Sequence, residues 1–133
     1  MTARFVLDPK SLDVIVASNL HGDILTDLGG AVIGSLGMAP SGNLNPERNF
    51  PSMFEPIYGS APDIYGKKIA NPYGIILSGA MMLDFLGETE AAALITFAVK
   101  QATRRGILTP DVGGISKTKD VTEAVIQQIR SYS

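Results

Sequence analysis

The sequence contains no cysteine, which excludes disulfide bonds and thiolate metal ligands. Charged residues are also few: they make up 18% of the 133 residues, whereas hydrophobic residues make up 45%. A chain of this composition is expected to fold around a core rather than to remain disordered. The net charge is −2 and the lysines and arginines are scattered, which does not suit a general polyanion binder. We therefore expect one globular unit with no nucleic-acid partner.

Long apolar runs are absent as well. A helix that spans a bilayer needs about 20 consecutive apolar residues, and the longest candidate runs here are interrupted by Asp, Gly or Lys. The first ten residues, MTARFVLDPK, lack the apolar centre of a secretory signal. These absences predict a cytoplasmic protein with no membrane partner.

The spacing of apolar residues predicts an α/β protein with few strands. The β-branched run LDVIVAS, residues 12–18, predicts a buried strand, and a helix is expected from His21 to about Leu36. Residues 37–52 are expected to form a loop, and Met53 to begin a short strand before a long loop that ends at Pro72. Further helices are predicted at 73–87, apolar nearly all round and hence buried, and stopped by Gly87; at 88–106; and at 118–130, with Thr118 as a candidate N-cap. Two or three strands make a poor sheet, so the chain either assembles with another or belongs to a larger domain.

Two aspartates, Asp23 and Asp27, lie four residues apart in an otherwise apolar stretch, NLHGDILTDLGG. On a helix this spacing places both carboxylates on one face, where they repel each other. They either face water or bind a hard divalent cation such as Mg²⁺ or Mn²⁺, and spacing alone favours the first interpretation. A complete cation site would also need substrate, water or further carboxylates. His21, the one histidine, is interpreted as a polar residue near the helix end rather than as a catalytic group.

The loop from Glu55 to Asn71 contains a second candidate site, YGSAPD at residues 58–63. Its small residues permit close approach of a ligand to the backbone, and Tyr58 could stack on an adenine ring. Asp63 could accept hydrogen bonds from ribose hydroxyls and would repel a 2′-phosphate. The alternative is a structural loop rich in proline and glycine, since no G-x-G-x-x-G fingerprint is present.

Taken in order, three segments resemble the β-decarboxylating dehydrogenase family, which includes isocitrate and isopropylmalate dehydrogenases. They are NLHGDILTDLGGAVIGSLGMAPSGNLNPER, FPSMFEPIYGSAPDIYGKKIANP and SGAMMLDFLG, and the resemblance extends from about Arg4 to Ile129. NLNPER before FPSMFEP is most similar to the tartrate/D-malate dehydrogenase branch. The resemblance implies the C-terminal part of the isopropylmalate dehydrogenase-like fold, few strands packed with several helices. Residues 1–133 would then form a single partial domain.

The resemblance also implies a role for each candidate residue. Asp23 and Asp27 match the two aspartates that bind Mg²⁺ or Mn²⁺. The residues that match the site for the adenosine half of NAD are Glu55, Tyr58, Gly59, Ser60, Ala61, Asp63 and Asn71. Tyr58 occupies a position where most members have His. Asp63 implies NAD rather than NADP.

The implied reaction is NAD-dependent oxidative decarboxylation of a 2-hydroxy dicarboxylic acid. NAD accepts hydride from the C2 alcohol, and the divalent ion then acts as a Lewis acid while CO₂ leaves. No residue of this chain matches a catalytic residue of the family. Its substrate-clamping arginines, its Tyr and Lys, and a further metal carboxylate are expected in the N-terminal part that the chain does not match.

Three hypotheses follow from this partial match. The chain represents a tartrate/D-malate-type dehydrogenase that is inactive as this fragment alone, it belongs to the isopropylmalate dehydrogenase branch, or it is a non-catalytic fragment. The helix at residues 22–36 matches one at the dimer interface of the family. The partners implied are a small hydroxy acid and either a second copy of the chain or the missing N-terminal part.

Overall fold

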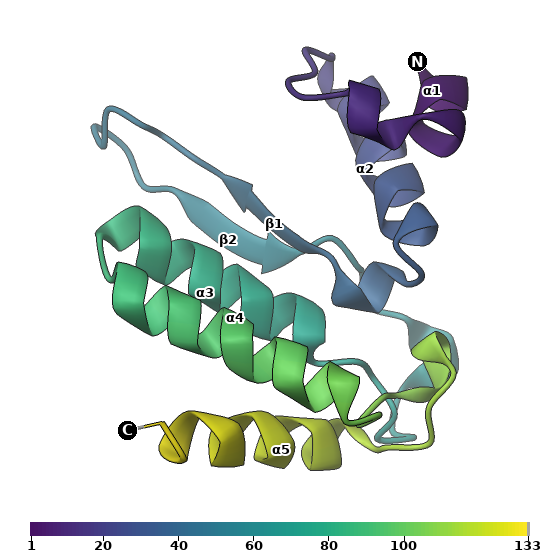
Figure 1. Cartoon of the computed structure of the whole chain (residues 1–133). Helices are drawn as coiled ribbons and strands as arrows, with labels where there is room; N and C mark the ends of the chain where they lie inside the picture. Colours follow the sequence, from purple (N-terminus) through teal and green to yellow (C-terminus); the bar gives the residue numbers. More distant parts are fainter. Residues whose placement is uncertain (133) are drawn as a thin grey trace.

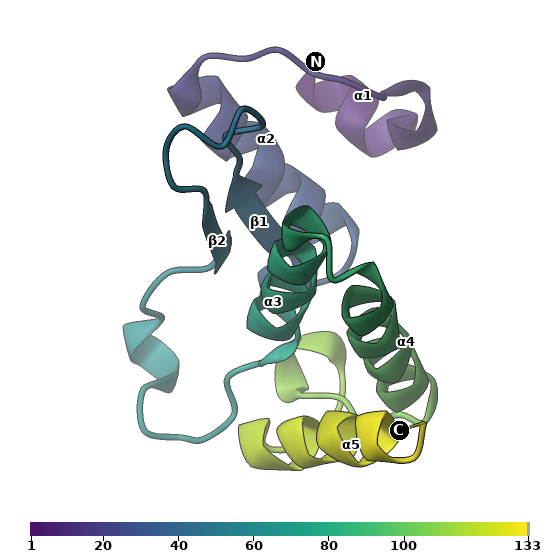
Figure 2. The ribbon, with the colours of Figure 1, turned by 90° about the vertical axis from the view of Figure 1, so that its left-hand side faces the viewer.

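The computed structural model describes residues 1–132, which form a helical layer and a smaller N-terminal part (Figure 1). The helices are α1 (Thr2–Leu7), α2 (Asn19–Val32), α3 (Tyr73–Leu86), α4 (Thr89–Arg104) and α5 (Thr118–Arg130). The strands are β1 (Pro40–Asn43) and β2 (Met53–Pro56), and the 3₁₀ turns are η1 (Pro9–Ser11), η2 (Leu36–Met38), η3 (Pro62–Ile64) and η4 (Pro110–Val112). The β hairpin packs on α3, α3 on α4, and α4 on α5, whereas α1 and α2 project away from this stack (Figure 2).

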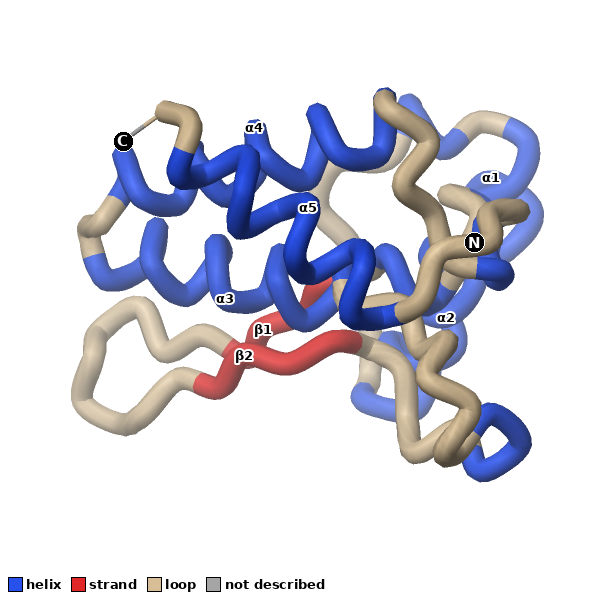
Figure 3. The backbone as a smooth tube through the Cα atoms, turned by 90° about the horizontal axis from the view of Figure 1, so that it is seen from below, coloured by secondary structure: helices blue, strands red, loops and turns tan. Residues whose placement is uncertain are grey.

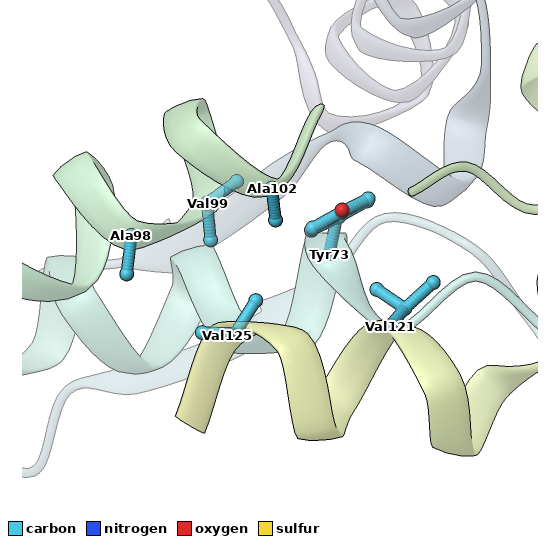
Figure 4. Packing of buried hydrophobic residues seen from close by; sticks show 6 residues of the cluster. All are labelled: Tyr73, Ala98, Val99, Ala102, Val121 and Val125. Atoms are coloured by element: carbon cyan, nitrogen blue, oxygen red, sulfur yellow. The ribbon is translucent and has the colours of Figure 1, made fainter. Parts of the chain in front are cut away.

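The core lies where α3, α4 and α5 meet (Figure 4). Its buried members are Tyr73, Ala98, Val99, Ala102, Val121 and Val125. Small residues on α4 let the neighbouring helices approach closely, and valines on α5 fill the remaining space. The hydroxyl of Tyr73 donates a hydrogen bond to the carbonyl of Ile107 at 2.7 Å. Burial raises the pKa of Tyr73 to about 12, so the phenol stays neutral.

The sheet has two antiparallel strands, which follow α3 on the side away from α4 (Figure 3). Pro40 pairs with Pro56 and Asn43 with Met53. The predicted strand at Met53 is confirmed, but the loop predicted for residues 37–52 is wrong where β1 forms. The sequence of β1, PSGN, has low strand propensity, so its conformation comes from backbone pairing with β2 rather than from its own side chains.

The predicted strand at residues 12–18 does not form. Within residues 1–132 no strand pairs with this segment, and a strand without a hydrogen-bonding neighbour is not stable in water. Val14 is 85% exposed and Val16 96% exposed, so the expected burial is absent too.

The predicted helices form, with corrections at three places. The helix expected to reach Leu36 ends at Val32, and Gly34 has the left-handed conformation, φ = 113°. Gly87 ends α3 as predicted, with φ = 94°, but one side of this apolar helix is not buried as expected, since Ile75 is 48% exposed. Thr118 is the first residue of α5 and not its N-cap.

Thr118 connects α5 to the long loop instead of capping the helix. Its hydroxyl donates to the carbonyl of Ala70 at 2.6 Å, while the carboxylate of Asp120 accepts from the backbone N–H of Lys117 at 2.8 Å. The hydrogen bond from Thr118 connects the start of α5 to the end of the long loop. None of the helices in residues 1–132 is long and apolar enough to cross a membrane.

Candidate functional site

A polar cavity of about 700 Å³ opens between α2 and the β hairpin. Its lining comes from three stretches of the chain: residues 17–27, which lead into α2 and form its first half; strand β1; and the end of β2 with the first residues of the loop that follows. Helix α2 contributes Asp23 and Asp27, β2 contributes Glu55, and the loop contributes Tyr58 and Gly59. The structure therefore brings both predicted metal ligands together with three of the predicted cofactor residues.

The aspartates face this cavity because of the turn of α2. Leu25 lies between them in sequence and is buried on the opposite side of the helix, while both carboxylates are exposed. Two carboxylate oxygens at a polar opening suit Mg²⁺ or Mn²⁺, which bind few protein carboxylates and retain waters. Within residues 1–132, no group of three or more His, Cys, Asp or Glu side chains could hold a metal. The aspartate pair therefore fits the implied metal only as part of its ligand set.

Tyr58 is held against the first turn of α3. A Cβ atom placed on Gly74 would lie 3.1 Å from the tyrosine Cε1, so the glycine leaves the space that the ring uses. Partial burial raises the pKa of Tyr58 above its ordinary value of 10.0, which keeps the phenol neutral. One edge of the Tyr58 ring therefore packs against α3 at Gly74, and the residue still lines the cavity.

The remaining residues of YGSAPD lie outside the cavity lining. Ser60 and Asp63 are exposed, and Ala61 has a left-handed backbone, φ = 41°, immediately before η3. Figure 2 shows this segment as a projecting loop with a single helical turn. Its far end is anchored by the N–H of Thr118, which donates to the carbonyl of Lys68 at 3.0 Å. Asp63 therefore presents a free carboxylate to solvent on an anchored loop.

Asn71, predicted to bind the cofactor, has its side chain engaged inside the protein. It is 6% exposed; its Oδ1 accepts from the N–H of Tyr73 and its Nδ2 donates to Asp111 Oδ2, both at 2.9 Å. These two hydrogen bonds hold the Asn71 side chain inside the protein.

Asp111 was missed by sequence analysis. Its carboxylate accepts hydrogen bonds from the hydroxyl of Ser35, from Thr109 Oγ1 at 2.6 Å and from Asn71 Nδ2. Burial alone would raise the pKa of Asp111, but these hydrogen bonds and one from its own backbone N–H outweigh it and lower the pKa. The one local signal is Thr-Pro-Asp at 109–111, a sequence typical of a side-chain-stabilised turn.

His21 takes no part in the cavity lining. Its Nδ1 lies 3.0 Å from the hydroxyl of Ser18, the residue that precedes α2. This agrees with the interpretation of His21 as a polar residue at the helix end.

Comparisons with known proteins give a consistent relationship. A family model described as Isocitrate/isopropylmalate dehydrogenase matches residues 1–125. A probable tartrate dehydrogenase/decarboxylase of Agrobacterium vitis is 60% identical over 97% of this chain and 35% of its own length. The decarboxylating D-malate dehydrogenase of Escherichia coli is 54% identical over 97% of this chain and 37% of its own length.

Solved structures agree with this relationship and confirm the predicted fold. Isocitrate dehydrogenase from Methylococcus capsulatus matches with a TM-score of 0.90 and 40% identity, over 97% of this chain and 38% of its own. A β-decarboxylating dehydrogenase from Thermococcus kodakarensis matches with a TM-score of 0.84 and 48% identity, over 98% and 38%. The chain spans little more than a third of the length of these relatives. It belongs to the isocitrate/isopropylmalate dehydrogenase family.

Proposed function

We propose that the chain supplies the metal aspartates and the adenosine-binding loop of an NAD-dependent, divalent-metal-dependent dehydrogenase. The reaction proposed is oxidative decarboxylation of a 2-hydroxy dicarboxylic acid of the tartrate or D-malate type. The names of the relatives at 54% and 60% identity support this reaction. The observation that carries the proposal is the cavity in which Asp23 and Asp27 of α2 meet Tyr58 and Gly59.

The proposal assigns a role to each of these residues. Asp23 and Asp27 would hold the divalent ion, which would also relieve their mutual repulsion one turn apart on α2. A bound ion would supply Lewis-acid polarisation of the hydroxy acid, and NAD would supply the hydride acceptor. Gly59 lets a ligand approach the backbone closely. Substrate clamping and proton transfer are assigned to no residue of this chain.

The loop residues account for the proposed choice of NAD. The carboxylate of Asp63 is exposed and has room to accept hydrogen bonds from ribose hydroxyls, and it would repel a 2′-phosphate. The ring of Tyr58 offers a face for adenine, and Ser60 and Ala61 add little bulk between the two. Glu55, also exposed, lines the cavity together with Tyr58.

The metal assignment is tested by titrating the chain with Mn²⁺ and following the electron paramagnetic resonance of the free ion. Asp23→Asn and Asp27→Asn should each weaken binding at least about tenfold, because each removes one of two charged ligands without changing shape. Asp84→Asn is the matched control: this exposed aspartate of α3 lies outside the cavity, and binding should not change. Equal affinity in all three variants would remove the aspartate pair from the metal site.

Cofactor choice and substrate are tested separately. Saturation-transfer NMR should show contact of the chain with NAD in preference to NADP, and Asp63→Asn should reduce that preference. NADH formation with Mn²⁺ is then measured for D-malate, tartrate and isopropylmalate after the chain is joined to the remainder of a longer family member. Preference for isopropylmalate would place the chain in that branch, and no turnover with any of the three would make it non-catalytic.

A further inference from the structure

Helix α2 meets the helical layer at a short junction just after its C-terminal end. There η2 packs against the first turn of α3, and α1 and α2 extend away from the layer (Figure 1). The packing at this point is tight: a Cβ atom on Gly37 would lie 2.7 Å from the Cβ of Asn71 and 2.8 Å from Asp111 Oδ2. The junction therefore has little room for alternative arrangements.

One carboxylate joins the three chain segments that meet here. Asp111, in η4, accepts hydrogen bonds from Ser35, from Asn71 and from Thr109. Ser35 directly precedes η2 and also accepts the N–H of Gly37 at 2.9 Å. Asn71 ends the long loop and also caps the N–H of Tyr73. No other single side chain in residues 1–132 forms hydrogen bonds to both of these segments.

We infer that Asp111 is a positioning residue whose carboxylate fixes the orientation of α2 relative to the loop at residues 57–72. Ser35 moves with α2, Asn71 moves with the loop, and both donate to the same carboxylate. Removing Asp111 frees both donors at once. Asp111 does not line the cavity, so it acts through these neighbours and not by contact with a ligand.

The consequence for ligand binding rests on the proposed function. Asp23 and Asp27 belong to α2, whereas Tyr58 and Gly59 belong to the loop, and the two groups face one cavity. A rotation of α2 would change the distance between a bound metal and a bound cofactor. It would leave the aspartate pair on α2 and the residues of the loop each intact. Asp111 would thus determine how the two halves of the site face each other.

The absence of cysteine allows a direct test by paired spin labels on the chain. One pair, Ala31→Cys with Gln127→Cys, reports on α2 against α5; the other, Glu90→Cys with Gln127→Cys, reports on α4 against α5. All three positions are exposed. Asp111→Ala should shift and broaden the α2–α5 distance distribution and leave the α4–α5 distribution narrow. Asp111→Asn should give a smaller effect, because it keeps one acceptor oxygen.

The matched control is Asp120→Ala, which also removes a carboxylate that accepts a backbone N–H but lies at α5. It should leave the α2–α5 distribution as in the parent chain. The inference is overturned if Asp111→Ala leaves that distribution unchanged, or if it broadens both label pairs equally. Neither measurement needs metal or NAD, so failure of the proposed function would not be mistaken for failure of this inference.

A second readout separates positioning from general stability. In the parent chain, bound Mn²⁺ should broaden the amide signals of α2 and of Gly59 through paramagnetic relaxation. Asp111→Ala should keep the Mn²⁺ affinity and the α2 broadening but reduce the broadening at Gly59. Unchanged broadening at Gly59 would count against a positioning role.

Discussion

At the scale of single residues, the most distinctive electrostatic feature is the Asp111 carboxylate with its three side-chain donors. Its pKa in the folded chain lies below the ordinary value of 3.8 because of these hydrogen bonds. An acid with a lowered folded pKa stabilises the fold above its ordinary pKa, and this contribution is lost as the pH falls through the lowered value. We therefore expect the free energy of unfolding to fall below about pH 4 partly through Asp111.

Urea unfolding between about pH 6 and pH 3 measures this contribution. The parent chain should lose stability more steeply than Asp111→Asn, whose side chain does not titrate. Asp84→Asn, which removes an exposed carboxylate on α3, serves as the control and should follow the parent curve. Parallel curves for the parent chain and Asp111→Asn would show that this carboxylate does not titrate with folding.

The role of a residue could be predicted only where a local sequence pattern indicates that role. Spacing identified Asp23 and Asp27 as a pair on one helix face, but the family resemblance was needed to prefer metal binding over exposure to water. Asp111 was not predictable, because its donors Ser35 and Asn71 lie 76 and 40 residues away. Side-chain hydrogen bonds over such separations depend on the fold and leave no local pattern.

At the scale of elements, the junction between α2 and α3 depends on a glycine that has no special backbone angle. Gly37→Ala should destabilise the chain by about 1–3 kcal/mol, because the new methyl group would meet Asn71 and Asp111 in a packed site. Gly79→Ala in the middle of α3 is the matched change: nothing lies within 4 Å of its added methyl group. It should stabilise the chain by up to about 1 kcal/mol through helix propensity.

Chemical denaturation of the parent chain and both variants measures these opposite signs. A stabilising Gly37→Ala would mean that the junction is looser than the structure shows. A destabilising Gly79→Ala would mean that this face of α3 is covered in solution.

The helices were predictable at this scale, whereas of the strands only the one that begins at Met53 was predicted. Apolar spacing and the C-terminal glycine Gly87 are local signals, and α3, α4 and α5 form near the expected positions. A strand depends on a neighbour elsewhere in the chain. The apolar run at 12–18 has none among the described residues and stays irregular, whereas the weak strand former PSGN pairs with β2.

At the scale of the whole molecule, apolar side chains are unevenly distributed between the helical layer and the N-terminal part. The layer holds the core cluster, while α1 has no buried residue and α2 has only Leu25 and Gly30. Val14, Val16 and Leu20 are each more than 60% exposed. The stability of the described chain should therefore come from the layer and hardly at all from residues 12–18.

A pair of matched valine substitutions tests this division. Val16→Thr should change the free energy of unfolding by less than about 0.5 kcal/mol, because the side chain is 96% exposed. Val121→Thr should cost about 1–3 kcal/mol, because it places an unpaired hydroxyl in the core at a fully buried position. Urea unfolding measures both, and binding of a hydrophobic dye should fall only in Val16→Thr. If Val16→Thr costs as much as Val121→Thr, residues 12–18 are buried in solution, as the sequence first predicted, and another polypeptide segment must cover them.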